Sequence, residues 1–465
     1  MKKLSIVLCL HLSAIAAGLG QPAKPGGASN STAAVPGAIR NGHPAWIIQG
    51  NVYEVNVRQY TVQGTFNAFA QHLGRLKQMG VQTLWFMPIN PISVTDRKGS
   101  LGSYYAVSDY TAVNPEFGTL ADFKKLVSSI HNLSMKVIID WVPNHTGADH
   151  RWLRDHPDFY EKDSTGNAAV PFGWTDTRQL DYKNTAMQDS MIACMKYWID
   201  ATGIDGFRCD VAWNVPGPFW ARCIGQLKKM KSIFMLAEGD KAYLLKNGFD
   251  ATYPWDMFHM MAKVAKGERP AIALDSIRNQ YNTDYPQNAM ELYFTSNHDE
   301  NSWNQADYAV FPGASHAPFA VFTQTMAGSI PLIYSGQEEP VLRAIKFFDK
   351  DTIQFGKFSR VPFYKTLLAL HKRNAALAAD AAFRKVVVGD EDGLYAYIRE
   401  KAGKKVLVIL NLSASQQTVT VKDKDLPGDA YNVFMGVRER PGGKSWMIEP
   451  WGYAVYEYGV AGPGK

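Results

Sequence analysis

The sequence predicts an α/β protein, in which a parallel (β/α)8 barrel with a short excursion after its third strand is followed by a C-terminal antiparallel β-sandwich domain. Three observations lead to this expectation. Apolar runs of strand length alternate with helix-patterned segments from about residue 49 to residue 373. Four of these runs end in polar side chains, as barrel strands do when a site lies at their carboxyl ends. From about residue 379 the chain changes to short alternating strands.

The barrel elements follow from the positions at which apolar residues recur. In the first helical segment, Phe66, Phe69 and Leu73 have the spacing of one helix face. Thr119 is expected to cap a later helix, because its side chain can accept a hydrogen bond from the first turn. Strands are expected over residues 49–60, 82–89, 251–255, 291–297 and 331–335, and in runs that begin near 137, 206 and 233. Helices are expected over residues 65–79, 119–133, 186–201, 218–230 and 362–373.

The alternation of strands and helices sets the domain boundaries. It stops between residues 145 and 184, where the chain is irregular and rich in aromatic residues. In the C-terminal part, strands are expected over residues 386–388, 394–398, 406–410, 418–421 and 453–458. The chain therefore divides into residues 1–20 (signal peptide), 21–42 (flexible linker), 43–378 (the barrel, with 145–184 as a short inserted region) and 379–465 (the C-terminal β domain).

The N-terminus has the pattern of a secretory signal peptide. A Lys-Lys start, an apolar stretch and small residues near position 20 are its three parts. The segment that follows is rich in Pro, Gly, Ala and Ser, which is typical of a flexible tether. We therefore expect the protein to be secreted or periplasmic.

Composition limits the partners. The chain has 465 residues and a formal net charge of +6, and its basic residues are dispersed, so no nucleic-acid partner is expected. After the leader, no segment reaches the roughly 18 apolar residues of a membrane span. Beyond the leader the cysteines are Cys194, Cys209 and Cys223, an odd number that does not describe a disulfide framework. A Cys194–Cys223 bridge stays open, although we do not favour it.

The most informative stretch is residues 203–212, Gly-Ile-Asp-Gly-Phe-Arg-Cys-Asp-Val-Ala. A short apolar run bounded by glycines predicts a buried strand, from which Arg208 and Asp210 point to the same side. The guanidinium is expected to hold the pKa of Asp210 low, because an opposite charge favours the ionised carboxylate. An ionised carboxylate at a strand end is a candidate nucleophile. Taken alone, however, such a pair more often has a structural role.

Three further stretches end in the same way. Residues 137–145 finish in Asp-Trp-Val-Pro-Asn-His, residues 235–238 are Met-Leu-Ala-Glu, and residues 294–301 are Phe-Thr-Ser-Asn-His-Asp-Glu-Asn. With DWVPNH, GFRCDVA, LAEGD and FTSNHDEN in this order, the sequence resembles the α-amylase family of glycoside hydrolases from about residue 50 onward. Four ordered motifs are specific, whereas any one of them alone would not be.

The resemblance implies roles for three carboxylates. It makes Asp210 the nucleophile, Glu238 the general acid/base and Asp299 the third carboxylate, which binds the distorted sugar ring. Cleavage of a glycosidic bond needs an acid for the departing oxygen and a second carboxylate on the other side of the sugar. The apolar residues before Glu238 favour a raised pKa for its carboxyl group, as a general acid requires.

The same resemblance implies residues that bind the substrate or support the site. Histidines would donate to sugar hydroxyls, and Tyr105 would stack beneath the ring, with Tyr104 as the alternative. The substrate-binding set is Tyr105, His145, Arg208 and His298, and the supporting set is Asp140 and Asn144. Four tryptophans near strand ends either stack on sugars or pack in loops: Trp141, Trp174, Trp213 and Trp303.

Calcium is where the sequence departs from the family pattern. Asn144 matches a residue that ligates a structural calcium in many members, but Gln179 stands where a partner aspartate is expected. Trp213 and Asn214 replace the usual Lys-His pair. A hard cation prefers several oxygen ligands with carboxylates among them. We therefore expect no required cofactor and no metal at this site.

The resemblance predicts a retaining, endo-type hydrolase of α-1,4-glucosidic bonds in starch, glycogen or maltooligosaccharides, so that an α-glucan is the expected partner. A transglycosylase, or a cyclomaltodextrinase or α-glucosidase-type enzyme of the same family, is the first alternative, because its carboxylates would be the same. A non-catalytic glucan-binding protein is the second. All three carboxylates are present, which disfavours this second alternative.

Overall fold

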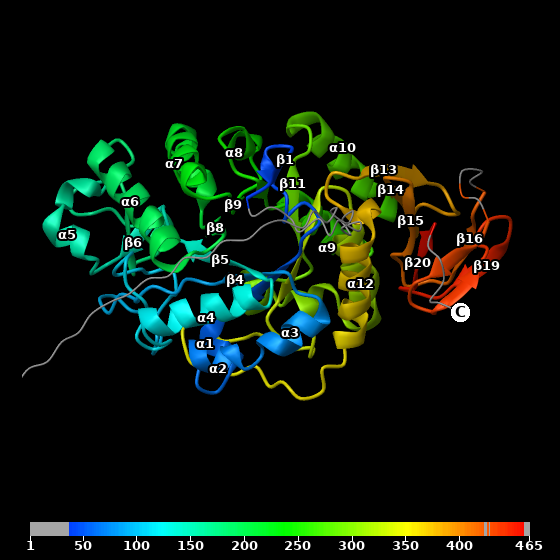
Figure 1. The fold of residues 1–465 in the computed structure, drawn as a ribbon, viewed down its shortest axis with the longest axis horizontal. Coiled ribbons are helices and arrows are strands. Elements are labelled where there is room, and N and C mark those ends of the chain that lie inside the picture. The colour runs from blue at the N-terminus through cyan, green and yellow to red at the C-terminus, as the bar shows by residue number, and fades with distance from the viewer. Residues whose placement is uncertain (1–36, 423–425, 427, 460–465) are drawn as a thin grey trace, which may run out of the picture. The chain divides into compact units, whose positions relative to one another are not determined.

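In the computed structural model, which describes residues 37–422, 426 and 428–459, eight parallel strands close into a barrel. Each strand pairs with the next, and the last returns to the first through the pairing of Leu332 with Val52. The barrel strands are β3 (Val52–Val55), β4 (Thr83–Phe86), β5 (Lys136–Trp141), β8 (Gly206–Cys209), β9 (Phe234–Ala237), β10 (Ala251–Thr252), β11 (Met290–Tyr293) and β12 (Ser329–Tyr334). The barrel predicted from the sequence is confirmed (Figure 1).

Helices between the strands pack around the barrel (Figure 1). They are α2 (Phe66–Ala70), α3 (Leu73–Met79), α4 (Leu120–Asn132), α6 (Thr185–Thr202), α7 (Gly217–Met230), α8 (Ala242–Lys246), α9 (Trp255–Ala265), α10 (Leu274–Asp284), α11 (His316–Thr325) and α12 (Val361–Arg373). Thr119 caps α4 as expected: its side chain accepts from the N–H of Asp122 at 3.1 Å, and Asp122 accepts from the N–H of Thr119 at 2.9 Å. This reciprocal capping box fixes where the helix begins.

Several barrel strands are shorter than the apolar runs predicted, and two of them end where a helix begins. The expected strand over residues 49–60 divides into β3 and the helical turn α1 (Val57–Tyr60). The cause is Asn56, whose side chain accepts a hydrogen bond from the N–H of Gln59 at 3.3 Å and so caps the turn. The expected strand over residues 251–255 ends at Thr252, before α9. Apolar runs show burial, but they do not show where backbone hydrogen bonding changes from sheet to helix.

The segment between β5 and α6 leaves the barrel. It contains α5 (Arg151–Asp155) and an antiparallel pair of strands, β6 (His145–Gly147) and β7 (Thr177–Gln179). Their pairing places Gln179 directly opposite His145. The excursion therefore returns to the carboxyl end of β5, where the candidate site lies.

The C-terminal part contains a six-stranded antiparallel sheet in the order β13-β14-β15-β20-β17-β18 and a two-stranded sheet of β16 and β19. Leu407 and Ile409 of the larger sheet belong to one apolar cluster with Val419 and Ile448 of the smaller, as in a sandwich. The strands are β13 (Ala382–Val386), β14 (Leu394–Lys401), β15 (Lys404–Asn411), β16 (Gln417–Thr420), β17 (Ala430–Asn432), β18 (Val437–Glu439), β19 (Ser445–Ile448) and β20 (Tyr453–Tyr458). The sequence did not predict β17, β18 and β19, and the strand expected over residues 386–388 lies earlier in the chain, as β13.

Residues 1–36, which include the predicted signal peptide and most of the predicted linker, lie outside the described residues. The end of that linker is described, and it is not free. Strand β1 (Ile39–Arg40) pairs with β2 (His43–Pro44), and Arg40 forms an ion pair of 2.7 Å with Asp380. Strand structure thus begins inside the segment 21–42 that composition assigned to a flexible linker.

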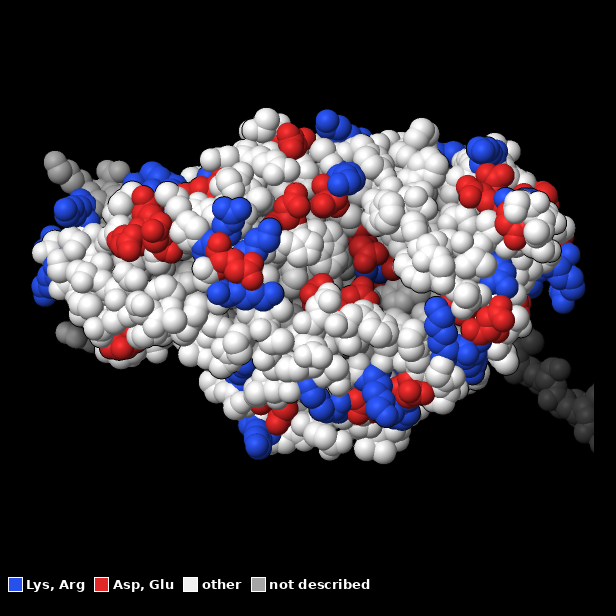
Figure 2. Space-filling view, turned by 180° about the vertical axis from the view of Figure 1, so that it is seen from behind, with Lys and Arg blue, Asp and Glu red and all other residues white. Residues whose placement is uncertain are grey.

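Three further observations concern thiols, membranes and surface charge. Cys194, Cys209 and Cys223 are buried free thiols, so the Cys194–Cys223 bridge is not formed. Within the described residues, no helix combines the length and the apolar character that crossing a membrane requires. On the face shown in Figure 2, Lys and Arg side chains are interspersed with Asp and Glu rather than gathered in one stripe.

Candidate active site

The carboxyl ends of the barrel strands bring together most of the residues singled out from the sequence. Arg208 lies in β8 and Asp210 follows it, Glu238 follows β9, and His298 and Asp299 follow β11. Several of these side chains border a cleft of about 410 Å³. The cleft is lined by Lys98, Ser103, Tyr105, His145, Trp174, Asp176, Thr177, Asp210, Val211, Trp213, Glu238, Trp255, Asp299, Trp303, Phe347 and Phe348.

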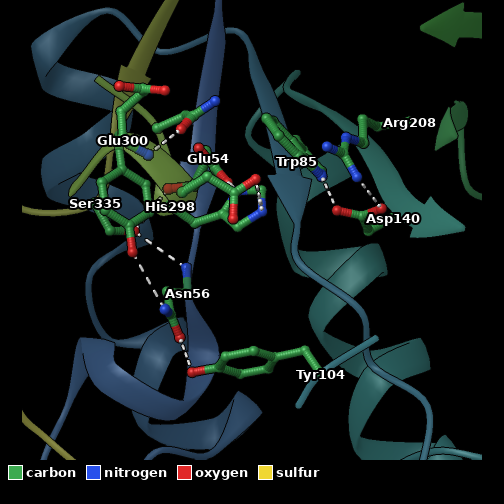
Figure 3. Close-up of polar contacts among 12 residues, drawn as sticks. Glu54, Asn56, Trp85, Tyr104, Asp140, Arg208, His298, Glu300 and Ser335 are labelled. Carbon is green, nitrogen blue, oxygen red and sulfur yellow. Dashed lines mark hydrogen bonds and ion pairs between the residues drawn. The ribbon is translucent and has the colours of Figure 1, made fainter. Parts of the chain in front are cut away.

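Arg208 joins acidic residues from three strands. Its guanidinium is fully buried and lies 3.0 Å from Asp140 Oδ1, 2.9 Å from Asp210 Oδ1 and 2.8 Å from Glu238 Oε1. Figure 3 shows its contact with Asp140. Its Nε donates to the hydroxyl of Tyr253 at 3.1 Å. Because a guanidinium is planar and always charged, this one side chain holds three carboxylates in a defined arrangement.

The pKa values of Asp210 and Glu238 differ in the sense opposite to the one expected from the sequence. Burial raises the pKa of Asp210 well above its ordinary value and the charge of Glu238 adds to this, while Arg208 opposes it. Burial also acts to raise the pKa of Glu238, but Arg208 and the N–H of Val211 outweigh it, and this pKa is lowered. Both expectations are therefore wrong for the free site. The reason is spatial, since Arg208 reaches Glu238 on the adjacent strand.

The residue after Asp210 has a strained backbone. Val211 has φ 44° and ψ 36°, in a left-handed region that a β-branched residue rarely adopts. This conformation directs its N–H to Glu238 Oε2 at 2.7 Å. A hydrogen bond from a backbone N–H favours the charged carboxylate. The strained turn therefore helps to orient Glu238.

Tyr105 and Asp299 line the cleft, and His298 lies buried next to both of them. The hydroxyl of Tyr105 donates to Asp140 Oδ2 at 3.1 Å and lies 2.7 Å from His298 Nε2. The two rings are stacked, with centroids 5.5 Å apart. His298 Nε2 is also 3.3 Å from Asp299 Oδ2. This arrangement ties the third carboxylate to the residues beneath it.

The structure distinguishes the two candidate tyrosines. Tyr105 lines the cleft. Tyr104 is fully buried, and its hydroxyl donates to Asn56 Oδ1 at 2.9 Å (Figure 3). Tyr105 is therefore the one that a sugar in the cleft could contact.

Glu54 belongs to this site, and the sequence reasoning missed it. It lies in β3, is fully buried, and its Oε1 is 2.5 Å from His298 Nδ1 (Figure 3). The available signal was a glutamate inside the buried strand Val-Tyr-Glu-Val. A charged residue is rarely buried unless it is paired, so its position pointed to a buried partner.

An amide network occupies the region of the family's calcium site. Asn144 Oδ1 accepts from Gln179 Nε2 at 3.1 Å and from Asn214 Nδ2 at 2.8 Å. Asn144 Nδ2 donates to Gln179 Oε1 at 3.3 Å. The amide oxygen of Asn144 that would ligate a cation thus already accepts two hydrogen bonds, and Gln179 and Asn214 bring amides where a hard cation prefers carboxylates. These residues do not fit calcium.

His145 lines the cleft next to Trp174, with ring centroids 5.4 Å apart. Burial lowers the pKa of His145 to about 4. The ring is therefore neutral near pH 7, where it has both a donor and an acceptor nitrogen. A neutral imidazole suits a sugar hydroxyl, which also donates and accepts.

One aromatic cluster lies next to Glu238. Phe172 contacts Trp174 and Trp213, with ring centroids 4.9 and 5.6 Å away, and all three side chains are substantially exposed. Trp213 packs on the backbone beside Glu238, because a Cβ added to Gly239 would lie 3.1 Å from its Cβ. We call these three residues the Phe172 cluster.

A second aromatic cluster consists of Trp303, Phe347 and Phe348. The ring of Trp303 lies 5.2 Å from that of Phe347 and 5.7 Å from that of Phe348. All three line the cleft, although the sequence reasoning named only Trp303. Trp141, by contrast, is fully buried, so three of the four tryptophans border the cleft.

Family models match most of the chain. The model described as "Alpha amylase, catalytic domain" matches residues 36–178 and 172–355, and "Alpha-amylase SusG C-terminal domain" matches residues 394–439. The chain is 26% identical over 398 residues to a protein named Alpha-amylase MalA from Haloarcula japonica. That match covers 81% of this chain but only 57% of the relative, so the chain spans little more than half of its length.

Solved structures have the same fold. An α-amylase from Lactobacillus plantarum has a TM-score of 0.79 and 29% identity, covering 89% of this chain and 99% of that one. A noncanonic maltogenic α-amylase, AmyB from Thermotoga neapolitana, has a TM-score of 0.80 and 26% identity, with coverages of 89% and 99%. The likeness thus extends over the barrel and the C-terminal sheets together.

Proposed function

This chain belongs to the α-amylase family of glycoside hydrolases, and we propose that it is a retaining, endo-type hydrolase of α-1,4-glucosidic bonds in starch, glycogen or maltooligosaccharides. One observation carries the proposal: Arg208 holds Asp210 and Glu238 side by side at a cleft that Asp299 also lines. Two carboxylates from adjacent strands supply the nucleophile and the acid that such hydrolysis needs.

In the proposed first step, Asp210 attacks the anomeric carbon while Glu238 gives its proton to the departing oxygen. A glycosyl ester of Asp210 and a shortened glucan with a free hydroxyl result. In the second step, Glu238 takes a proton from water, the water oxygen bonds to the anomeric carbon, and Asp210 leaves as a carboxylate. Two displacements from opposite faces restore the original configuration. Asp299 would bind ring hydroxyls.

The first step needs the proton on Glu238 and the charge on Asp210, which reverses the pKa order of the free site. The two carboxyl groups interact so closely that they titrate as a pair. When substrate binds, the glycosidic oxygen accepts a hydrogen bond from protonated Glu238, which favours the proton there. The sugar ring also separates the carboxyl groups of Asp210 and Glu238 from each other. Substrate binding itself would then complete the reactive protonation state.

Digestion of starch, pullulan and cyclodextrin, with product sizes measured, tests the proposal. An endo-acting enzyme is expected to give a range of maltooligosaccharides from starch early in the reaction. Faster cleavage of cyclodextrin than of starch would instead indicate a cyclomaltodextrinase. A folded protein that binds starch and cleaves none of the three would be a glucan-binding protein.

The Phe172 cluster favours a second candidate, glycosyl transfer to a sugar. Glu238 would act on the departing side of the bond, and the exposed side chain of Trp213 packs against Gly239, the residue that follows Glu238. An aromatic ring there can hold an acceptor sugar in place of water. Products longer than the substrate, formed from maltoheptaose, would establish transfer. Trp213→Ala should then lower the ratio of transfer to hydrolysis more than Trp303→Ala does.

A further inference from the structure

His298 has hydrogen-bond acceptors at both ring nitrogens. Nδ1 lies 2.5 Å from Glu54 Oε1, and Nε2 lies 2.7 Å from the hydroxyl of Tyr105 and 3.3 Å from Asp299 Oδ2. A neutral imidazole has one N–H, whereas an imidazolium has two. The state of the ring therefore depends on whether both nitrogens must donate.

The direction of the Tyr105 hydroxyl decides this. It donates its single proton to Asp140 Oδ2 at 3.1 Å, while Asp140 Oδ1 is paired with Arg208 at 3.0 Å. In this arrangement the tyrosine oxygen accepts from His298 Nε2. Nδ1 faces Glu54 Oε1, and an ionised carboxylate there accepts from Nδ1 as well. The imidazolium is the form of the ring that donates at both nitrogens.

We propose that Glu54 is a positioning residue that keeps His298 doubly protonated, so that its Nε2–H is held toward Tyr105 and Asp299 at the floor of the cleft. Glu54 is fully buried in β3 and does not line the cleft, so it acts through His298 and does not touch the substrate. This inference deepens the proposed function, and only its activity measurement rests on that function.

The surrounding charges support a charged ring. Burial opposes it, but Asp299 and Glu54 outweigh burial and raise the pKa of His298 to about 9, against the effect of Arg208. Burial also raises the pKa of Glu54, and His298 acts to lower it. The titratable groups around the ring are Glu54 from β3, Tyr105 from the loop before α4, Asp140 from β5, Arg208 from β8, Glu238 after β9, and Asp299 and Glu300 next to His298. Without Glu54 the ring loses its closest carboxylate and keeps a guanidinium nearby.

A histidine NMR titration tests the inference directly. The chain has 11 histidines, so a His298→Gln variant assigns the signal. Wild-type His298 is expected to stay charged up to about pH 8, whereas Glu54→Gln should lower its midpoint by about one pH unit or more. Glu54→Asp, which keeps the charge, should lower it less.

Glu338→Gln is the matched control. Glu338 is also a fully buried glutamate, but its oxygens contact the hydroxyl of Tyr53 at 2.8 Å and Arg75 at 2.9 Å instead of His298. Its replacement should disturb the barrel comparably and leave the His298 midpoint unchanged. A general loss of packing would shift the His298 midpoint in both Glu54→Gln and Glu338→Gln. The proposed role of Glu54 shifts it in Glu54→Gln alone.

The activity measurement is the pH dependence of kcat/KM on maltoheptaose. In Glu54→Gln the alkaline limb of this profile should move to lower pH by the same shift as the His298 midpoint, with little loss at pH 5.5, where an ordinary histidine is charged. A wild-type His298 that titrates near pH 6.5, or an unchanged midpoint in Glu54→Gln, would overturn the inference. If Glu54→Gln does not fold, the His298 midpoints of the wild type and of Glu54→Asp test the inference, which predicts a high value in both. A wild type that cleaves no α-glucan, yet shows the expected midpoints, counts against the proposed function and supports the inference.

Discussion

The side-chain amides of Asn144 and Gln179 hydrogen-bond to each other in both directions, at 3.1 and 3.3 Å. Asn214 adds a third amide, which donates to Asn144 at 2.8 Å. Each amide has a donor and an acceptor end, so the three side chains satisfy one another without a charged group. In this chain, an amide network can thus hold the excursion against the barrel.

Removal of calcium should leave this protein folded. The network offers no free amide oxygen at Asn144, so dialysis against a chelator is expected to change Tm by no more than a few degrees. Scanning calorimetry before and after dialysis measures this. A large drop in Tm that calcium restores and magnesium does not would contradict the prediction.

Loss of one amide should be destabilising. Gln179→Ala leaves the buried Asn144 amide without two of its hydrogen bonds, which should lower the free energy of unfolding by about 1–3 kcal/mol. Urea denaturation of the variant gives the value. Gln280→Ala, at an exposed position of α10, is the control and should change it little. Equal effects in the two variants would mean that the network adds no stability.

Asp210→Asn and Glu238→Gln should differ in the substrates on which they fail. Both should lose roughly a thousandfold or more on starch, because one lacks the nucleophile and the other the proton donor. On a maltosyl fluoride, whose leaving group needs no proton, Glu238→Gln should recover much of the first step. Asp210→Asn should not recover, because no ester can form. Rates on the two substrates for each variant provide the measurement.

Asp299→Asn completes that comparison. This carboxylate is placed to act on the ring, not on the departing oxygen, so the variant should be impaired on starch and on the fluoride alike. If Asp210→Asn keeps near-normal starch hydrolysis, the proposed role of Asp210 as the nucleophile is wrong.

The products should retain the α configuration. Asp210 and Glu238 follow adjacent strands and share Arg208, which favours the separation of about 5–5.5 Å of retaining enzymes over the wider gap of inverting ones. A proton NMR time course on starch reports the anomer that is released first. Initial release of the β-anomer would rule out the double displacement.

Glu291 should make the folded state less stable as the pH rises. It is buried in β11, one carboxylate oxygen has no hydrogen-bond partner, and burial raises its pKa from 4.5 to about 8. Between these values the unfolded chain loses a proton that the folded chain keeps, so stability falls as pH rises through this window. Glu291→Gln removes the effect and should raise Tm at pH 8 but not at pH 4.5.

The control for this prediction is Glu268→Gln, a substitution of an exposed glutamate. It should leave the pH dependence of Tm as in the wild type. If Glu291→Gln raises Tm equally at pH 4.5 and pH 8, its effect comes from packing and not from proton uptake.

The sequence by itself determined the order of the eight barrel strands and the strand ends that carry Asp210, Glu238 and Asp299. These features are local along the chain: periodicity reports which side of a segment is buried, and a polar residue after an apolar run reports where a strand ends. The sequence also showed that amides replace carboxylates in the region of the family's calcium site, because Gln179 stands where the family pattern has an aspartate. Boundaries such as the capped turn at Asn56 were not readable, because a side-chain hydrogen bond sets them.

Only the tertiary structure decided how these groups influence one another. Arg208 of β8 reaches Glu238 at the end of the adjacent strand β9 and thereby reverses the proton order that its spacing from Asp210 suggested. Glu54 and His298 lie at opposite ends of the barrel sequence and are brought within 2.5 Å by its closure. A pKa depends on burial and on every charge nearby in space, so residue order along the chain does not contain it.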